Sequence, residues 1–375
     1  MRQLKVRAVF MRGGTSRALF FHEADLPADP AARDRILLAA LGSPDPYGRQ
    51  LDGLGGGISS LSKAMIVGRP SVPDADVDYT FAQVSVSEPL VDYAGNCGNC
   101  TAAVGPFALD EGLVPTVEPE TVVRLYNTNT KKLVMARVPV DGGEAAVTGD
   151  FELQGVPGKG ARIALDFLDP GGAGTGRLLP SGRVLDVLDV PSVGRLEVSL
   201  VDATNPMVFV RAKDVGLTGT ELPEAVDADR GLAARVEAIR AAGAQAMGMP
   251  PSPAVPKIAM VAAPAPFRAL DGRQIAPSQA DVCARVISMG KCHRAFALTA
   301  AMCLGVAARI PGTVVREMLG GSRPSDVRLA HPSGLLPIDA VVEQRAGEWW
   351  ARQVTVYRTA RRLMEGFVRV AAAGP

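Results

Sequence analysis

The sequence has few of the features on which several classes of protein depend. Its three histidines, His22, His293 and His331, are far apart and form no pair of the kind that binds structural zinc. Lysine plus arginine number 40 and aspartate plus glutamate 39, so the net charge is only +1. This balance gives no reason to expect nucleic acid or an anionic membrane as a partner.

Long apolar segments are also lacking. The longest uncharged apolar run, residues 295–308, is shorter than the ~20 residues that cross a bilayer. Charged residues interrupt the first seven positions, where a signal peptide would be apolar. We therefore expect a cytoplasmic protein. Its odd number of cysteines then favours reduced thiols over a disulfide framework. These cysteines are Cys97, Cys100, Cys283, Cys292 and Cys303.

The residues that punctuate a β-rich fold are abundant. The 40 glycines and 29 prolines separate short runs in which apolar and smaller or polar residues alternate. A period of two is typical of half-buried strands. We expect strands near residues 4–10, 77–86, 122–126, 132–140, 162–167, 195–201, 207–211, 257–261 and 354–357.

Fewer segments have the features of helices. Residues 30–41 follow an N-cap aspartate and precede Gly42, and much of 221–247 is amphipathic. Residues 102–109 and 295–308 are nearly free of charge. A helix that is apolar all round is normally buried on every side. The strands are therefore expected to wrap around these two helices, one in each half.

The two halves resemble each other weakly. Residues 4–21 and 195–210 each read as a strand, a polar turn and a second strand, and further strands and an apolar helix follow in both halves. The predicted fold class is α+β, with domains at 1–189 and 190–375. The Pro/Gly-containing stretch 185–194 would join them, and the C-terminal segment is allowed to return to the first domain.

The strongest local motif runs from Gly95 to Thr101 and contains Cys97 and Cys100. A thiol at the start of a helix faces free backbone N–H groups and the positive end of the helix dipole, which favour thiolate. The same position binds anions. Zinc, a redox dithiol and two buried structural thiols are the alternative interpretations of this Cys-X-X-Cys pair.

A second motif is the glycine- and serine-rich stretch 51–62, which ends at Lys63 and an apolar strand. It is not a phosphate-binding P-loop, because no Gly-Lys-Ser/Thr opens a helix here. Lys63 could lose part of its hydration and act as a base. A surface lysine that ends a loop is the simpler alternative.

A third motif, Met11 to Arg17, contains two glycines followed by two hydroxyl side chains. It can form a backbone nest for a carboxylate or a plain hairpin turn. The second half offers polar groups at Asn205, Lys291, His293 and the turn 331–334.

Taken together, these segments resemble the PrpF-type methylaconitate isomerase family. That family includes oxalomesaconate tautomerases and methylitaconate isomerases, within the diaminopimelate epimerase-like superfamily. The matching stretches follow one another along nearly the whole chain. They are Met11-Arg-Gly-Gly-Thr-Ser, Gly42-Ser-Pro-Asp, Gln50-Leu-Asp-Gly-Leu-Gly-Gly, Leu61-Ser-Lys63, Gly95-Asn-Cys-Gly-Asn99, Thr175-Gly-Arg-Leu-Leu-Pro180, Asn205-Pro and Pro332-Ser-Gly334.

The resemblance implies two diaminopimelate epimerase-like domains, each a β-sheet rolled around a central helix, with the active site in the cleft between them. It also implies that Lys63 and Cys97 transfer protons, in an allylic 1,3-shift on a small unsaturated di- or tricarboxylate. We expect no cofactor and no metal. The expected substrate-binding residues are Gly14, Thr15, Ser16, Ser60, Asn96, Gly98, Asn99, Asn205, Lys291, His293, Ser333 and Gly334.

Two alternatives remain beside this interpretation. Cys292 lies near where an epimerase of the superfamily would have its second thiol, so a two-thiol racemase is one of them. A non-catalytic polycarboxylate-binding accessory protein is the other. Cys100 departs from the family pattern, which more often has an aliphatic residue there, and receives no catalytic role. The sequence does not fix the oligomeric state; a homodimer is the assembly we allow for.

Overall fold

The computed structural model describes residues 3–93, 95–191, 193–250, 252, 255–288, 290–322 and 324–371. The chain forms two compact units. Unit 1 comprises Met1–Asp166 and Tyr357–Pro375, and unit 2 comprises Phe167–Val356. The C-terminal segment therefore belongs to unit 1, together with the N-terminal strand.

The division between the units differs from the boundary expected at 189/190. β12 (Asp186–Val190) pairs antiparallel with β13 (Gly194–Ala203), from Asp186 opposite Val198 to Val190 opposite Gly194. The stretch 185–194 is thus largely a hairpin inside unit 2, although its residue 192 lies outside the described residues. Its proline and glycine mark a tight turn, which has the same composition as a linker.

Unit 1 is built on a sheet in which antiparallel and parallel strand pairs alternate. The pairs β1–β2, β3–β4 and β6–β7 are antiparallel, whereas β2–β3 and β4–β6 are parallel. β23 extends the sheet antiparallel to β1. The strands are β1 (Gln3–Gly13), β2 (Ser16–His22), β3 (Lys63–Gly68), β4 (Val77–Val84), β5 (Val91–Asp92), β6 (Glu120–Asn127), β7 (Lys132–Asp141), β8 (Glu144–Ala145), β9 (Phe151–Glu152), β10 (Lys159–Gly160), β11 (Ile163–Leu168) and β23 (Ala360–Ala371).

Unit 2 repeats this order of pairings. β13–β14, β15–β18 and β20–β21 are antiparallel, and β14–β15 and β18–β20 are parallel. Its other strands are β14 (Asn205–Arg211), β15 (Lys257–Ala262), β16 (Phe267–Arg268), β17 (Gln274–Ile275), β18 (Val282–Ser288), β19 (Lys291–Cys292), β20 (Asp326–His331), β21 (Gly334–Arg345) and β22 (Glu348–Arg358), which ends in unit 1. The expected strands are confirmed to within three residues at their ends, except that the strand expected at 354–357 already begins at Glu348.

The amphipathic helices form where capping residues predict them. α1 (Pro30–Leu41) starts after Asp29, whose Oδ2 accepts a hydrogen bond from the Ala32 N–H at 2.9 Å, and ends at Gly42 with φ 74°. The predicted helix within 221–247 is divided into α3 (Pro223–Ala228) and α4 (Arg230–Ala246). The break follows from Asp229, which caps α4. The short helix α6 (Val314–Met318) was not expected.

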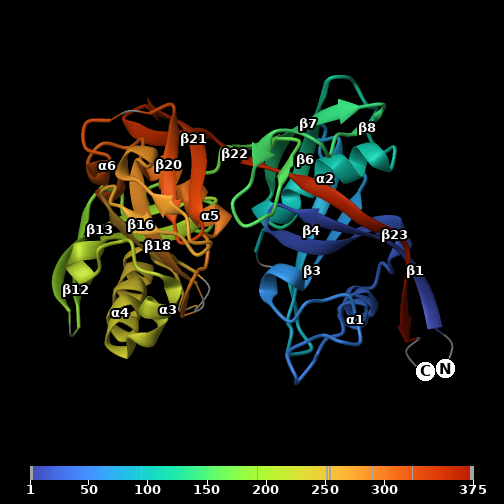
Figure 1. Cartoon of the computed structure of the whole chain (residues 1–375), viewed down its shortest axis with the longest axis horizontal. Coiled ribbons are helices and arrows are strands. Elements are labelled where there is room, and N and C mark those ends of the chain that lie inside the picture. Colours follow the sequence, from blue (N-terminus) through green and yellow to red (C-terminus); the bar gives the residue numbers. More distant parts are fainter. Residues whose placement is uncertain are drawn as a thin grey trace. The chain divides into compact units, whose positions relative to one another are not determined.

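Each unit has one apolar helix packed among its strands (Figure 1). α2 (Gly98–Asp110) is buried at every position except its second and last residues, and α5 (Leu298–Ala307) at every position except its second. Burying one large apolar side chain contributes roughly 1.5–3 kcal/mol, so each helix is a main source of stability for its unit. The prediction of two all-apolar helices enclosed by strands is confirmed.

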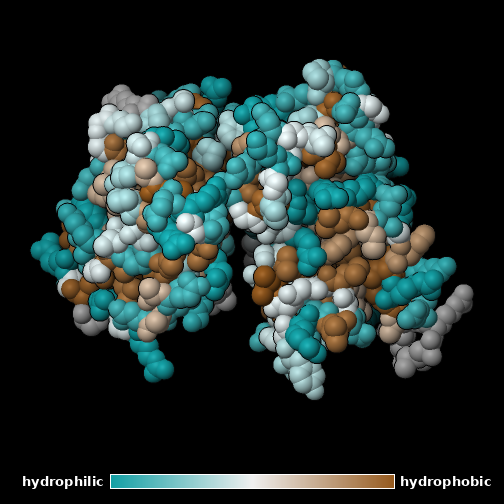
Figure 2. Space-filling model, in the orientation of Figure 1, coloured by the Kyte–Doolittle hydropathy of each residue, from teal (hydrophilic) through white to brown (hydrophobic). Residues whose placement is uncertain are grey.

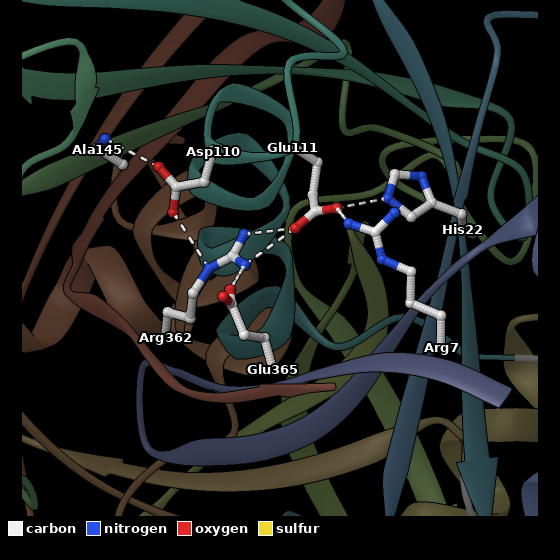
Figure 3. A network of polar contacts seen from close by, with 7 residues as sticks. All are labelled: Arg7, His22, Asp110, Glu111, Ala145, Arg362 and Glu365. Atoms are coloured by element: carbon white, nitrogen blue, oxygen red, sulfur yellow. Dashed lines mark hydrogen bonds and ion pairs between the residues drawn. The ribbon is translucent and has the colours of Figure 1, made fainter. Parts of the chain in front are cut away.

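Ion pairs surround the C-terminal end of α2 (Figure 3). Glu111 Oε2 accepts from Arg7 and lies 2.8 Å from His22 Nε2, and its Oε1 accepts from both Nη atoms of Arg362 at 2.9 Å. Cations at a helix C-terminus also interact favourably with the helix dipole. The network holds this end of α2 against the paired strands β1 and β23.

Apolar residues reach the surface in several places between hydrophilic ones (Figure 2). The most exposed large ones are Tyr47 and Leu51, in the loop between α1 and β3, and Phe367 in β23 is also exposed. None of the helices in the described part of the chain combines the length and apolar character needed to cross a membrane.

Candidate active site

Lys63 begins β3 and is only 7% exposed. Its Nζ donates a hydrogen bond to Gln83 Oε1 and lies 5.0 Å from the centroid of the Phe81 ring. Gln83 sits directly opposite Lys63 on β4, and its Nε2 donates to the carbonyl oxygen of Ser62 at 2.8 Å. The amine is therefore fixed by a neutral amide and an aromatic face. Within the described residues it has no carboxylate partner that would neutralise it.

Cys97 is the N-cap residue of α2, with extended backbone angles of φ −117° and ψ 93°. Its thiol is partly exposed, whereas the Cys100 thiol, one turn into the helix, is fully buried. Hydrogen bonding by the Cys100 thiol lowers the pKa of Cys97, and the positive charge of Lys63 acts in the same direction. Together with hydrogen bonds from the Cys100 backbone and the Ser16 side chain, these effects outweigh burial, which raises the pKa. Cys97 thus has the character of a thiolate, and Lys63 is near enough for its charge to matter.

The thiol of Cys100 has the opposite character. Its hydrogen bond to Cys97 and its burial both raise the pKa of Cys100 well above the ordinary value. One member of the pair therefore stays protonated and donates to the other.

The turn between β1 and β2 lies against the first turn of α2. Thr15 N–H donates to Asn99 Oδ1 at 3.4 Å, and Asn99 Nδ2 donates to Thr15 Oγ1 at 3.2 Å. Ser16 Oγ is 4.0 Å from Cys97 Sγ. A Cβ atom at Gly14 would come within 2.2 Å of Asn99 Oδ1, and Gly14 has φ 52°. Glycine is required here, since a side chain would push the turn away from the helix.

Other expected binding residues of unit 1 have mainly structural partners. Asn96 Oδ1 accepts a hydrogen bond from Thr101 Oγ1 at 3.4 Å, which ties the segment before α2 to the first turn of the helix. Gly98 is buried as the first residue of that helix. Ser60 lies in the short 3-10 turn Ser59–Leu61 that precedes Lys63. The structure thus places the unit 1 residues around the start of α2 and the start of β3.

Five of the expected residues belong to unit 2. Asn205 Nδ2 donates to the Pro206 carbonyl oxygen, and Lys291 is exposed in β19. His293 Nδ1 accepts from the Ala295 N–H at 3.1 Å, and burial lowers the pKa of this imidazole. Ser333 and Gly334 form the turn into β21, where Ser333 Oγ donates to the Arg294 carbonyl oxygen at 2.6 Å.

Cys292 is a core residue of unit 2. It is 5% exposed, packs in the apolar cluster between α4 and the sheet, and its N–H donates to Asp227 Oδ1 at 2.8 Å. Burial raises the pKa of this thiol to about 12. A thiol with that pKa supplies almost no thiolate near neutral pH, which argues against a two-thiol mechanism.

Sequence reasoning missed three residues of this site. Gln83 and Phe81 face Lys63 from β4, and the strand pattern contained no signal of that pairing. Arg358, near the other end of the chain, is 4% exposed and donates from Nε to Asn99 Oδ1 at 3.0 Å. No group of three or more His, Cys, Asp and Glu side chains among the described residues is placed to hold a metal ion.

The chain is similar to several known proteins over nearly its whole length. The family model described as "PrpF protein" matches residues 3–371. The 3-methylitaconate isomerase of Eubacterium barkeri is 45% identical, with 99% of this chain and 98% of that protein aligned. The 2-methyl-aconitate isomerase of Shewanella oneidensis is 43% identical, with coverage of 98% and 97%. A crystal structure of methylitaconate-delta-isomerase, 44% identical, superposes with a TM-score of 0.87 over 99% of this chain and 96% of that one.

Proposed function

Since this chain belongs to the PrpF family, we propose that it is an isomerase that moves a double bond in a small unsaturated polycarboxylate by a 1,3-proton shift. The relatives named above are isomerases of methylitaconate and of methylaconitate. These acids share a carbon–carbon double bond that carries a carboxylate, with at least one further carboxylate in the molecule. The proposed substrate class is therefore an unsaturated di- or tricarboxylate in which a C–H bond lies next to the double bond.

The observation that carries this proposal is the pairing of an amine with an activated thiol. Lys63 is held at the start of β3, and its charge helps to lower the pKa of Cys97 at the start of α2. Proton transfer needs a base and an acid whose pKa values are adjusted by their surroundings. The lowered pKa of Cys97 and the nearby charge of Lys63 support the assignment of these two groups as the proton-transfer pair.

We assign the base to Cys97 and the acid to Lys63. The Cys97 thiolate removes the allylic proton, and the electron pair of that C–H bond shifts to give a dienolate. The Lys63 ammonium then delivers a proton to the carbon at the far end of the allylic system. A proton transfer from the Cys97 thiol to the Lys63 amine restores both groups, so the cycle balances without a co-reactant.

The dienolate needs stabilisation, because its negative charge spreads onto a carboxylate. The first turn of α2 has no acidic residue, and its N–H groups are at the positive end of the helix dipole. Preorganised donors of this kind stabilise charge that develops in a transition state. The position of Cys97 as N-cap residue places the thiolate and these donors together.

The proposal is tested by hydrogen exchange in heavy water. The protein is incubated with a panel of aconitate-like, itaconate-like and mesaconate-like acids, and deuterium incorporation is followed by mass spectrometry. Lys63→Ala is expected to lower incorporation into a true substrate by about 10²–10⁴-fold, the usual contribution of a general acid or base.

Lys257 offers a matched control, because it also begins an apolar strand, β15 of unit 2. Lys257→Ala should retain incorporation, since that amine is not part of the proposed pair. Normal incorporation by Lys63→Ala would show that Lys63 is dispensable. Ligand binding without any incorporation by the wild-type protein would favour an accessory binding protein instead.

A further inference from the structure

Arg358 is a buried cation without a carboxylate partner among the residues that the structure describes. Its Nε donates to Asn99 Oδ1 at 3.0 Å and its Nη1 to the carbonyl oxygen of Tyr357 at 2.8 Å. The side chain forms no salt bridge with a carboxylate among the described residues, and its Nη2 donates no hydrogen bond to them. Arginine is almost never buried to this extent unless it is paired.

Burial lowers the pKa of Arg358 to about 10, which leaves the guanidinium charged near neutral pH. The cost of burying this charge is therefore not avoided by deprotonation. Two hydrogen bonds to neutral oxygens and the negative charge of the Cys97 thiolate offset only part of that cost, because the pKa remains below its ordinary value. An anion that binds at the remaining N–H groups would supply the missing compensation.

The guanidinium lies at the start of α2. Asn99, its hydrogen-bond partner, is in the first turn of that helix and also bonds Thr15. A Cβ atom at Gly14 would be 3.1 Å from Arg358 Cδ, so the arginine packs on the glycine turn. The negative charge of the Cys97 thiolate raises the pKa of Arg358, against the effect of burial. A buried cation and a helix N-terminus thus meet at one place in unit 1.

Arg12 also supports this turn. Its Nη1 donates to the carbonyl oxygens of Gly14 and Thr359, at 2.9 and 3.0 Å. Gly14 N–H in turn donates to Thr359 O at 2.9 Å. These bonds connect the β1–β2 turn to the segment just after Arg358, so the arginine is held in a defined position relative to α2.

We propose that Arg358 binds a carboxylate of the substrate, with Asn99 holding the guanidinium in orientation. The inference rests on the proposed function and names the group that anchors the polycarboxylate. A planar guanidinium binds a carboxylate through two parallel N–H donors, which fixes the orientation of the acid as well as its affinity. The carboxylate bound by Arg358 is one that does not react, and its role is to place the allylic C–H bond at Cys97.

The test measures affinity for acids that cannot react. Tricarballylate has three carboxylates and no double bond; glutarate and methylsuccinate each lack one of the three. Dissociation constants are measured by calorimetry for wild type and Arg358→Gln. We expect Arg358→Gln to weaken tricarballylate binding by about 10- to 100-fold, the contribution of a charge-assisted hydrogen bond.

A thermodynamic cycle identifies the contact. Removing the carboxylate that Arg358 binds should weaken affinity for the wild type but not for Arg358→Gln, so one of the two smaller acids should show a non-additive effect. Arg285→Gln is the control for the loss of a buried arginine, since Arg285 in unit 2 is 0% exposed and donates to backbone carbonyls. It should leave all three affinities unchanged.

Other outcomes overturn the proposal. Unchanged affinity of Arg358→Gln for all three acids would do so, as would additive losses. An effect confined to the thiolate absorbance of Cys97, with affinity unchanged, would show that Arg358 acts only on the thiol. If Arg358→Gln does not fold, a crystal structure of the wild type with tricarballylate tests the proposal. A carboxylate in contact with the guanidinium supports it, and the absence of that contact overturns it.

Failure of this inference is distinguishable from failure of the proposed function. Deuterium incorporation by the wild type, together with an unaffected Arg358→Gln variant, rejects the role of Arg358 alone. Absence of binding and of incorporation with every acid in the panel rejects the proposed function itself.

Discussion

The two units follow the same order of strand pairings, yet the thiols near their apolar helices have opposite chemistry. In unit 1 Cys97 is the N-cap of α2, and the Cys100 thiol and Lys63 lower its pKa. In unit 2 Cys292 lies in β19 before α5, and burial raises its pKa to about 12. A shared topology therefore does not imply a shared chemical role.

The cause of the difference is the position of each thiol relative to its helix. Cys97 is the last residue before the helical turns begin, where N–H groups are free. Cys292 is six residues ahead of the first residue of α5 and is packed in an apolar cluster, with a carboxylate, Asp227, on its own N–H. Only the first arrangement stabilises a thiolate.

The largest effect expected from this comparison is on turnover. Cys97→Ser should reduce deuterium incorporation into the substrate by about 10²–10⁴-fold, because a serine hydroxyl is not ionised near neutral pH and cannot serve as the base. Cys292→Ala should leave incorporation intact, since that thiol stays protonated in the core. Comparable losses of incorporation in both variants would support the two-thiol mechanism and would mean that the thiols of the two units have similar roles.

A smaller effect is expected on chemical labelling. A thiolate and not a thiol reacts with iodoacetamide, so a lowered pKa lets Cys97 react at a pH where ordinary thiols do not. Its labelling rate should rise as pH increases through this lowered pKa and level off below about pH 8.5, the ordinary value.

Cys292 provides the internal reference for that experiment. At about pH 7 Cys97 should be labelled at least ~10²-fold faster than Cys292, even though a lower pKa also reduces the intrinsic nucleophilicity of a thiolate. Peptide mass spectrometry after partial labelling measures both rates in one sample. Equal rates, or a Cys97 rate that still rises steeply above pH 9, would contradict the assigned thiolate.

Much of the architecture could be predicted because it depends on local patterns. Asp29, Pro30 and Gly42 mark both ends of α1, and the charge-free runs identified α2 and α5 as enclosed helices. The turn 11–17 was recognised from its glycines. These features need only neighbouring residues, which a sequence shows directly.

The remainder depends on contacts between distant segments. Arg358 meets Asn99 across 259 positions, through a strand that returns to unit 1. Gln83 meets Lys63 only because β3 and β4 pair in one particular register. Neither pairing leaves a periodic signal in the sequence. The stretch 185–194 is a different case: linkers and hairpin turns use the same residues, so its composition does not distinguish the two.

The smallest expected effect concerns packing, where the units are most alike. Each apolar helix has a glycine against a strand. An added Cβ at Gly105 would lie 2.8 Å from Val138 Cγ2 on β7, and one at Gly305 would lie 2.4 Å from Ile338 Cγ2 on β21. Overpacking of a core costs typically ~1–3 kcal/mol, whereas alanine favours a helix over glycine by up to ~1 kcal/mol. The closer approach at Gly305 predicts that Gly305→Ala lowers the free energy of unfolding by ~1–2 kcal/mol and that Gly105→Ala lowers it less.

Calorimetric unfolding of the two variants checks this order, and Gly231→Ala serves as the control. Gly231 is in an exposed part of α4, where an added Cβ would approach Asp229 Oδ1 to 3.3 Å and touch no strand. That change should leave the unfolding temperature unchanged or slightly raise it. A greater loss for Gly105→Ala than for Gly305→Ala would mean that Val138 cannot move aside as easily as Ile338. The helix that presents the thiolate would then be the more rigidly packed of the two, because the strand that covers it tolerates less displacement.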